Sequence, residues 1–180
     1  GNGGAIYATG SSTISGNSFT GNTSDGNGGA IYASSALTIT NSLLTNNSAS
    51  GDGGAIYAAT NLTLNADNGE TIISGNTAGG YNNGIYMNKQ NGILNLNATN
   101  NGTITIADAI TSGQAYTLNL SGDNTSSINI LDSHLASSSS SWSDKSVSVT
   151  VTGSPNISFE DNEIETYSVK SWSSSDTARY

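Results

Sequence analysis

A hexapeptide recurs at a constant spacing near the start of the chain, and this repeat restricts the fold more than any other feature. Gly-Gly-Ala-Ile-Tyr-Ala stands at 3–8, 28–33 and 53–58, so the period is 25 residues twice in succession. A degenerate copy, Asn-Gly-Ile-Tyr-Met, follows at 83–87 after about four additional residues, which we place between 66 and 71. A fixed period of this length indicates an architecture of stacked repeats.

A second motif recurs with the same period between the copies of the first. Phe19, Leu44 and Ile73 each precede an Asn by three positions. Between the two motifs, the segments at 13–15, 37–40 and 62–64 alternate apolar and polar residues. Such alternation, bounded by Gly and Asn, predicts half-buried β-strands. Since no segment shows the 3.6-residue spacing of an amphipathic helix, the chain is predicted to be all-β.

A single repeat of this length is too short to bury its own apolar face. Repeats stacked about 4.8 Å apart bring each strand beside its copy in the next turn, parallel and in register. We therefore predict a right-handed single-stranded parallel β-helix, a solenoid of about seven coils of ~25 residues. A leucine-rich repeat has a similar period, but its Leu-x-x-Leu-x-Leu pattern is only weakly represented. The predicted inward ladders are Ile6, Ile31, Ile56 and Ile85; Phe19, Leu44 and Ile73; and Ile14, Ile39 and Leu64.

The same register predicts a turn ladder and an exterior stripe. Asn tolerates left-handed backbone and its amide can hydrogen-bond along a stack, while the Gly-Gly pair frees the backbone at a corner. Side chains alternate across a strand, so the residue after each inward Ile points outward. Exterior tyrosines of this kind can bind sugar rings or a partner, or simply shield the sheet. The predicted turn ladder is Asn22, Asn47 and Asn76, and the predicted exterior stripe is Tyr7, Tyr32, Tyr57 and Tyr86.

The whole chain, 1–180, is predicted to be one β-helical unit with three parts. Regular repeats occupy 1–88, plainer coils 89–136, and less regular coils with a Ser-rich loop 137–180. The chain opens within a repeat and has neither an initiator Met nor a signal peptide, so we expect a piece of a longer protein.

The charge pattern excludes some classes of partner. Only 9% of residues are charged and the net charge is −9, with four scattered basic residues. Nucleic acids and anionic lipids require clustered Lys and Arg, so neither is expected as a ligand. No apolar run reaches the ~18–20 residues that span a bilayer. The chain contains no Cys, so a disulfide framework and a thiolate metal site are both excluded.

Few residues suit catalysis or metal binding. Catalysis on glycans needs paired carboxylates, often with a basic residue, whereas most acids here fall singly at turns. His134 is the sole His and has no Cys to join it, and the cluster around Glu160 lacks the spacing of a calcium loop. We therefore expect neither a catalytic nor a metal site, and no cofactor. The acids concerned are Asp25, Asp52, Asp67, Asp108 and Asp123 at turns, and Glu160, Asp161, Glu163 and Glu165 in the cluster.

The paired motifs resemble the repeats of chlamydial polymorphic outer-membrane proteins and, more broadly, passenger domains of autotransporter adhesins. The resemblance rests on Gly-Gly-Ala-Ile at 3–6, 28–31 and 53–56, and on Phe-x-x-Asn at 19–22 with its Leu and Ile variants at 44–47 and 73–76. It covers roughly 1–88, and 93–131 look like the plainer coils of such passengers. It implies a right-handed parallel β-helix, type V secretion and adhesion to host or neighbouring cells.

The leading hypothesis is thus an adhesin passenger fragment on a bacterial surface: a rod that presents a binding surface to a cell receptor or glycan. One rival is a carbohydrate-active β-helix enzyme, a polysaccharide lyase or hydrolase. Another is an ice- or surface-binding solenoid, for which the column Thr13, Thr38 and Thr63 is the sole indication. Unpaired strand edges at the ends of a solenoid also predict end-to-end self-association.

Overall fold

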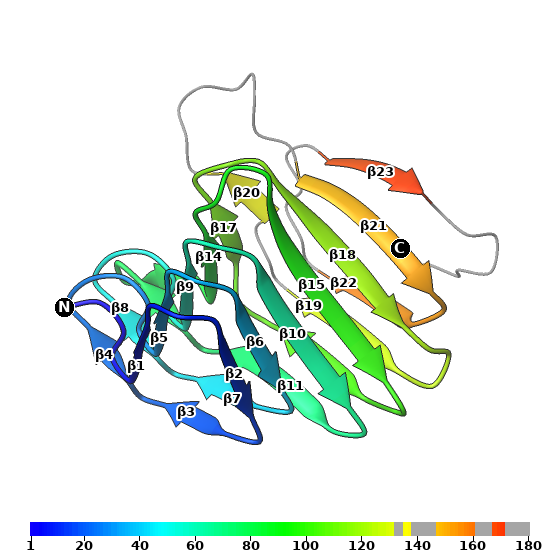
Figure 1. Ribbon diagram of the computed structural model, residues 1–180, viewed down its shortest axis with the longest axis horizontal. Coiled ribbons are helices and arrows are strands. Elements are labelled where there is room, and N and C mark those ends of the chain that lie inside the picture. The colour runs from blue at the N-terminus through cyan, green and yellow to red at the C-terminus, as the bar shows by residue number, and fades with distance from the viewer. Residues whose placement is uncertain (132–134, 138–146, 161–166, 172–180) are drawn as a thin grey trace.

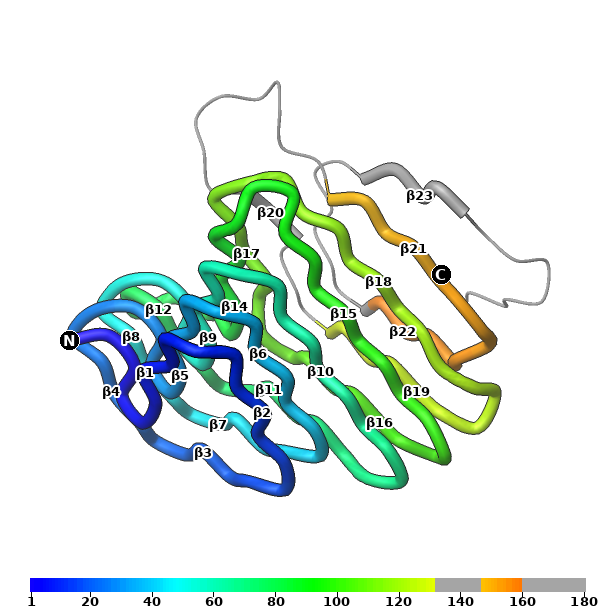
Figure 2. The backbone as a smooth tube through the Cα atoms, in the orientation of Figure 1, coloured from blue at the N-terminus to red at the C-terminus, as the bar shows by residue number. Residues whose placement is uncertain are grey.

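The computed structural model describes residues 1–131, 135–137, 147–160 and 167–171. These residues form strands and turns without a helix, and the chain winds through successive turns from one end of the molecule to the other (Figure 2). Neighbouring strands of the three long sheets pair in parallel, each with its counterpart one turn later. The predicted parallel β-helix is therefore confirmed. No helix in the described part is long and apolar enough to cross a membrane.

Four sheets run along the solenoid, here named A to D (Figure 1). Sheet A contains β1 (Ile6–Ala8), β5 (Ile31–Ala33), β9 (Ile56–Ala58), β14 (Ile85–Met87), β17 (Ile110–Ser112) and β20 (Leu135–Ser137). Sheet B contains β2 (Ser12–Ser15), β6 (Leu37–Thr40), β10 (Leu62–Asp67), β15 (Gly92–Thr99), β18 (Tyr116–Gly122), β21 (Val147–Gly153) and β23 (Tyr167–Ser171). Sheet C contains β3 (Ser18–Thr20), β7 (Leu43–Thr45), β11 (Glu70–Ser74), β16 (Thr103–Ile106), β19 (Ser127–Leu131) and β22 (Asn156–Glu160). Sheet D contains β4 (Thr23–Ser24), β8 (Ser48–Ala49), β12 (Thr77–Ala78) and β13 (Tyr81–Asn82).

The described residues make about six turns, whereas about seven were predicted for the whole chain. The first coils keep the 25-residue period of the sequence repeat, the next stacked residues lie 29 and 32 positions apart, and the spacing then returns to 24 for one coil. Longer strands account for part of this difference, since β2 has 4 residues and β15 has 8. The same number of residues therefore completes fewer turns.

The register places the first insertion where the sequence predicts it. Asn65 pairs with Thr40 and Ile72 pairs with Leu43, so the additional residues lie between Asn65 and Ile72. Asn68 has a φ of 47° there, a left-handed conformation that Asn tolerates better than most residues.

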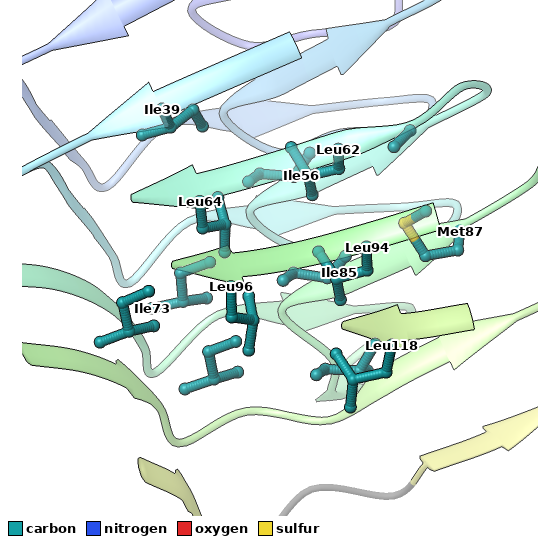
Figure 3. Packing of buried hydrophobic residues seen from close by; sticks show 14 of the residues in the cluster. Ile39, Ile56, Leu62, Leu64, Ile73, Ile85, Met87, Leu94, Leu96 and Leu118 are labelled. Carbon is teal, nitrogen blue, oxygen red and sulfur yellow. The ribbon is translucent and has the colours of Figure 1, made fainter. Parts of the chain in front are cut away.

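The apolar core fills the interior of the coils with like residues stacked on like (Figure 3). Ile31, Ile56 and Ile85 pair in register in sheet A and are fully buried. Leu62, Leu94 and Leu118 do the same in sheet B. The other predicted inward columns also pair in register: Ile6 with Ile31, Phe19 with Leu44 and Ile73, and Ile14 with Ile39 and Leu64.

Candidate functional site

The four tyrosines of the predicted stripe lie on sheet A, each at the middle position of a three-residue strand. Tyr7, Tyr32, Tyr57 and Tyr86 pair in register through β1, β5, β9 and β14. Their rings are nearly parallel, with centroids 4.9, 5.0 and 5.3 Å apart along the series. The stack ends at Thr111, which pairs with Tyr86 in the next turn. We call these four residues the tyrosine stack.

Stacking determines which parts of the tyrosine side chains a ligand can contact. Sugar rings and aromatic ligands bind aromatic side chains mainly through the ring faces. In the tyrosine stack the ring faces lie against one another, so Tyr32 and Tyr57 each have a tyrosine on both faces. A ligand approaching from the side therefore contacts ring edges and hydroxyl groups. The predicted stacking of sugar rings is therefore confined to Tyr7, which has a tyrosine on one face only and is the most exposed member of the stack.

Exposure falls steeply along the tyrosine stack. The side chain of Tyr7 is 57% exposed and Tyr32 is half-buried, whereas Tyr57 and Tyr86 are 7% and 9% exposed. All four tyrosines lie outside the hydrophobic core cluster, but Tyr57 and Tyr86 are buried and therefore not exposed as an exterior stripe would be. Only Tyr7 and Tyr32 form an accessible surface.

Later residues explain the burial of the second half of the stack. The side-chain amide of Asn88 donates a hydrogen bond to the hydroxyl of Tyr57. Gly113 lies so close to the hydroxyl of Tyr86 that a Cβ there would be 2.6 Å from it. Burial is the largest cause that raises the pKa of Tyr57, and the hydrogen bond from Asn88 opposes it. Tyr57 therefore stays a neutral structural member of the stack at physiological pH.

The two glycines before each stack strand serve different purposes. Gly28 and Gly53 both have a φ of 70°, in the left-handed region, so the first glycine supplies the corner conformation. The second glycine permits close approach between chains. A Cβ on Gly29 would lie 2.0 Å from the carbonyl oxygen of Gly54 in the next turn. The sequence predicts the freedom of the first glycine but does not predict the contact of the second.

The asparagines of the predicted turn ladder are joined by hydrogen bonds in one direction. The backbone N–H and side-chain amide of Asn22 both donate to Oδ1 of Asn47, at 2.9 and 2.8 Å. Asn47 donates in the same way to Oδ1 of Asn76, at 2.9 Å for both bonds. The left-handed conformation predicted for these asparagines belongs instead to the residue before each: Gly21, Asn46 and Gly75.

Asp108 accepts the last hydrogen bonds of this ladder. It is 3% exposed, and its carboxylate accepts from the backbone N–H of Gly75 and from the backbone and side-chain N–H groups of Asn76. Asp108 does lie singly at a bend between β16 and β17, but its role in completing the asparagine ladder was not predicted from the sequence. The repeat motif does not reveal this role, because Asp108 is spaced differently from the ladder asparagines. Asp108 lies two positions after Ile106, whereas each ladder Asn lies three positions after its apolar residue.

Two of the other acids in the described part of the chain contact the same asparagine. Asp67 and Asp123 both hydrogen-bond to Asn100. Hydrogen bonds from Thr125, Ser126 and the Asn100 backbone hold the pKa of Asp123 well below its usual range, whereas a general acid needs a raised pKa. No group of three metal-binding side chains occurs in the described residues. His134 and the acidic cluster Glu160, Asp161, Glu163 and Glu165 lie outside the residues whose side chains the structure describes.

Comparison with known proteins identifies the repeat. Two segments, 18–34 and 41–59, match the model of the Chlamydia polymorphic membrane protein repeat. Each segment holds one apolar-x-x-Asn motif and one Gly-Gly-Ala-Ile motif, so each links an Asn of the ladder to the strand that carries the next stacked tyrosine. No significant match was found among curated proteins or among solved structures.

Proposed function

The chain carries the Chlamydia polymorphic membrane protein repeat, and we propose that it is part of a surface-displayed adhesin: a rigid, non-catalytic rod that holds a binding surface away from the bacterial cell. The repeat match is the observation that carries this proposal, because it joins the two motifs to a family of membrane proteins. The β-helix supports it, since a solenoid stacked on a continuous core is stiff along its axis. We place the protein at the outer membrane of a Gram-negative bacterium, as a passenger delivered by type V secretion.

Tyr7 and Tyr32 are the proposed contact residues for a cell receptor. Together they present ring edges and hydroxyl groups beside an exposed corner, and tyrosine is enriched at interface hot spots. Asp25 is 99% exposed near this end of the chain, so a partner with neutral or basic groups is favoured over a polyanion.

The test is attachment of the purified chain to cultured epithelial cells, measured by flow cytometry. Tyr7→Ser combined with Tyr32→Ser should weaken attachment at least about tenfold, as expected for loss of hot-spot tyrosines. Tyr81→Ser is the matched control, because Tyr81 is 80% exposed on the hairpin of sheet D. Equal attachment of the wild type and the double variant would refute the tyrosine contact. No attachment by the wild type would count against an adhesive role for this part of the protein.

The rival proposal of a polysaccharide lyase or hydrolase is tested on the same sample. Release of reducing ends or unsaturated products from a polysaccharide panel would establish an enzyme. We expect no release, because the pKa of Asp123 is lowered, whereas the general acid of a glycosidase needs a raised pKa.

Self-association is a further part of this proposal. In the isolated chain, β1, β2, β3 and β4 are edge strands of their sheets, and edge strands readily pair with another chain. We expect light scattering during size-exclusion chromatography to show a dimer that dissociates on dilution. A monomer at all concentrations would contradict this expectation.

A further inference from the structure

The outer side of sheet B carries two columns of uncharged polar side chains. Their members pair in register from β2 to β21, so each column crosses six strands. We call these two columns the polar face. They are Thr13, Thr38, Thr63, Asn95, Asn119 and Thr150, and Ser15, Thr40, Asn65, Asn97, Ser121 and Thr152.

Hydrogen bonds along the columns fix the amides of the polar face in one orientation. Asn119 donates through Nδ2 to Oδ1 of Asn95 at 2.9 Å, and Asn95 donates to the hydroxyl of Thr63 at 3.2 Å. In the second column Asn97 donates to Oδ1 of Asn65 at 2.9 Å. A side-chain amide has two N–H donors, and each of these three bonds uses one. The second N–H remains available, repeated along the solenoid on half-buried, preorganised side chains.

The composition of the polar face limits the kind of ligand that it suits. No member is charged, so a polyanion has nothing to pair with and is repelled by the net charge of −9. Protein interfaces are usually anchored by Trp, Tyr or Arg, and the two columns contain none of these. Hydroxyl groups of neutral sugars both donate and accept, so they match amide and hydroxyl side chains. A polymer of such units laid across the strands meets similar groups at every strand, about 4.8 Å apart.

We propose that the polar face binds uncharged oligosaccharide chains. This site is separate from the tyrosine stack and does not depend on the proposed receptor contact. The hydroxyl column Thr13, Thr38 and Thr63 continues as Asn95 and Asn119, so the face is an array of mixed amides and hydroxyls. Mixed donors and acceptors suit the varied hydroxyl directions of a sugar chain better than a uniform lattice such as ice.

The experiment is calorimetric titration of the purified chain with maltohexaose, cellohexaose, chitohexaose and mannohexaose, with dextran sulfate as the polyanion. We expect binding of at least one uncharged hexasaccharide and none of dextran sulfate. Thr13→Val with Thr38→Val removes two hydroxyl groups, for neither of which the structure shows a hydrogen bond. Each removed hydroxyl group that bonds to the sugar chain should weaken binding about three- to tenfold. Asn95→Leu should weaken binding similarly while keeping the side-chain volume.

Matched controls lie on the outer side of sheet C. Thr103→Val and Asn129→Leu make the same substitutions on half-buried strand residues there and should leave binding unchanged. Failure of every uncharged hexasaccharide to bind would overturn the proposal, as would equal weakening in the sheet B and sheet C variants. Ice recrystallisation inhibition without sugar binding would also overturn it and would favour an ice-binding face. The receptor proposal would be unaffected, because its own test uses Tyr7 and Tyr32.

Discussion

The side-chain amide of Asn76 lies 2.6 Å from the carboxylate of Asp108 and donates a hydrogen bond to it, which ends the asparagine ladder. In earlier turns, the backbone N–H before the ladder Asn bonds to a backbone carbonyl; Asn46, for example, donates to Ser74. At the last step Gly75 donates to Asp108 Oδ1 instead. One carboxylate therefore replaces both the amide oxygen and the backbone carbonyl that a further repeat would supply. The strands of sheet D end at this step, with β13 antiparallel to β12.

Asp108→Asn should lower the free energy of unfolding by about 1–3 kcal/mol, because an amide offers one acceptor where the carboxylate offers two. Asp108→Ala should cost more, since it leaves all three donors unpaired. Urea denaturation followed by circular dichroism measures both. Equal stability of Asp108→Asn and the wild type would show that one acceptor suffices.

Asn47→Ala should be among the most destabilising substitutions in the chain. Asn47 is 1% exposed and its side chain bonds to Asn22, Asn76 and the carbonyl of Phe19. Each buried group left unpaired costs about 1–3 kcal/mol, so the total loss should exceed about 3 kcal/mol. Asn22→Ala is the comparison, because Asn22 lies at the edge of the ladder. Its thermal midpoint should fall less than that of Asn47→Ala. Similar losses for the two variants would contradict a cooperative ladder.

Gly53→Ala should destabilise the corner before β9 by more than about 2 kcal/mol, from the left-handed backbone and a steric clash together. Its φ is 70°, and a Cβ there would lie 2.3 Å from the carbonyl oxygen of Ile56. Gly10→Ala is the control, because no atom lies within 4 Å of the Cβ that it would add. Thermal denaturation of the two variants should therefore separate them clearly, and a stable Gly53→Ala protein would rule out the clash.

Tyr116 gives a prediction for alkaline pH. Its hydroxyl is buried without a hydrogen-bond partner in the described structure, and burial raises the pKa of Tyr116 well above its usual value. Because the pKa is higher in the folded protein, the Tyr116 hydroxyl loses its proton at a lower pH in the unfolded chain than in the folded protein. The contribution of the protonated Tyr116 to stability is therefore complete below pH ~10 and is lost as pH rises further. Tyr116→Phe should leave stability unchanged or higher at pH 7 and reduce the alkaline loss. Absorbance at 295 nm during an alkaline titration reports phenolate formation, and early ionisation of Tyr116 in the folded protein would contradict the prediction.

The sequence alone determined the solenoid and its repeat register. The 25-residue spacing of Ile6, Ile31 and Ile56 places like residues side by side, and period-2 alternation decides which side of the strand each occupies. These are local and periodic properties, so they can be counted along the chain. The insertion between Asn65 and Ile72 was predictable for the same reason.

Tertiary structure decided which outward residues remain accessible and which acid completes the ladder. Tyr7 and Tyr57 have the same local sequence, yet one is exposed and the other is buried, because Asn88 approaches from a later turn. Asp108 reaches Gly75 and Asn76 from 33 and 32 residues away, where the lengthened coil departs from the 25-residue period. Contacts between irregular coils depend on how long each turn is after the repeat has faded, and beyond that point there is no period left from which to count them.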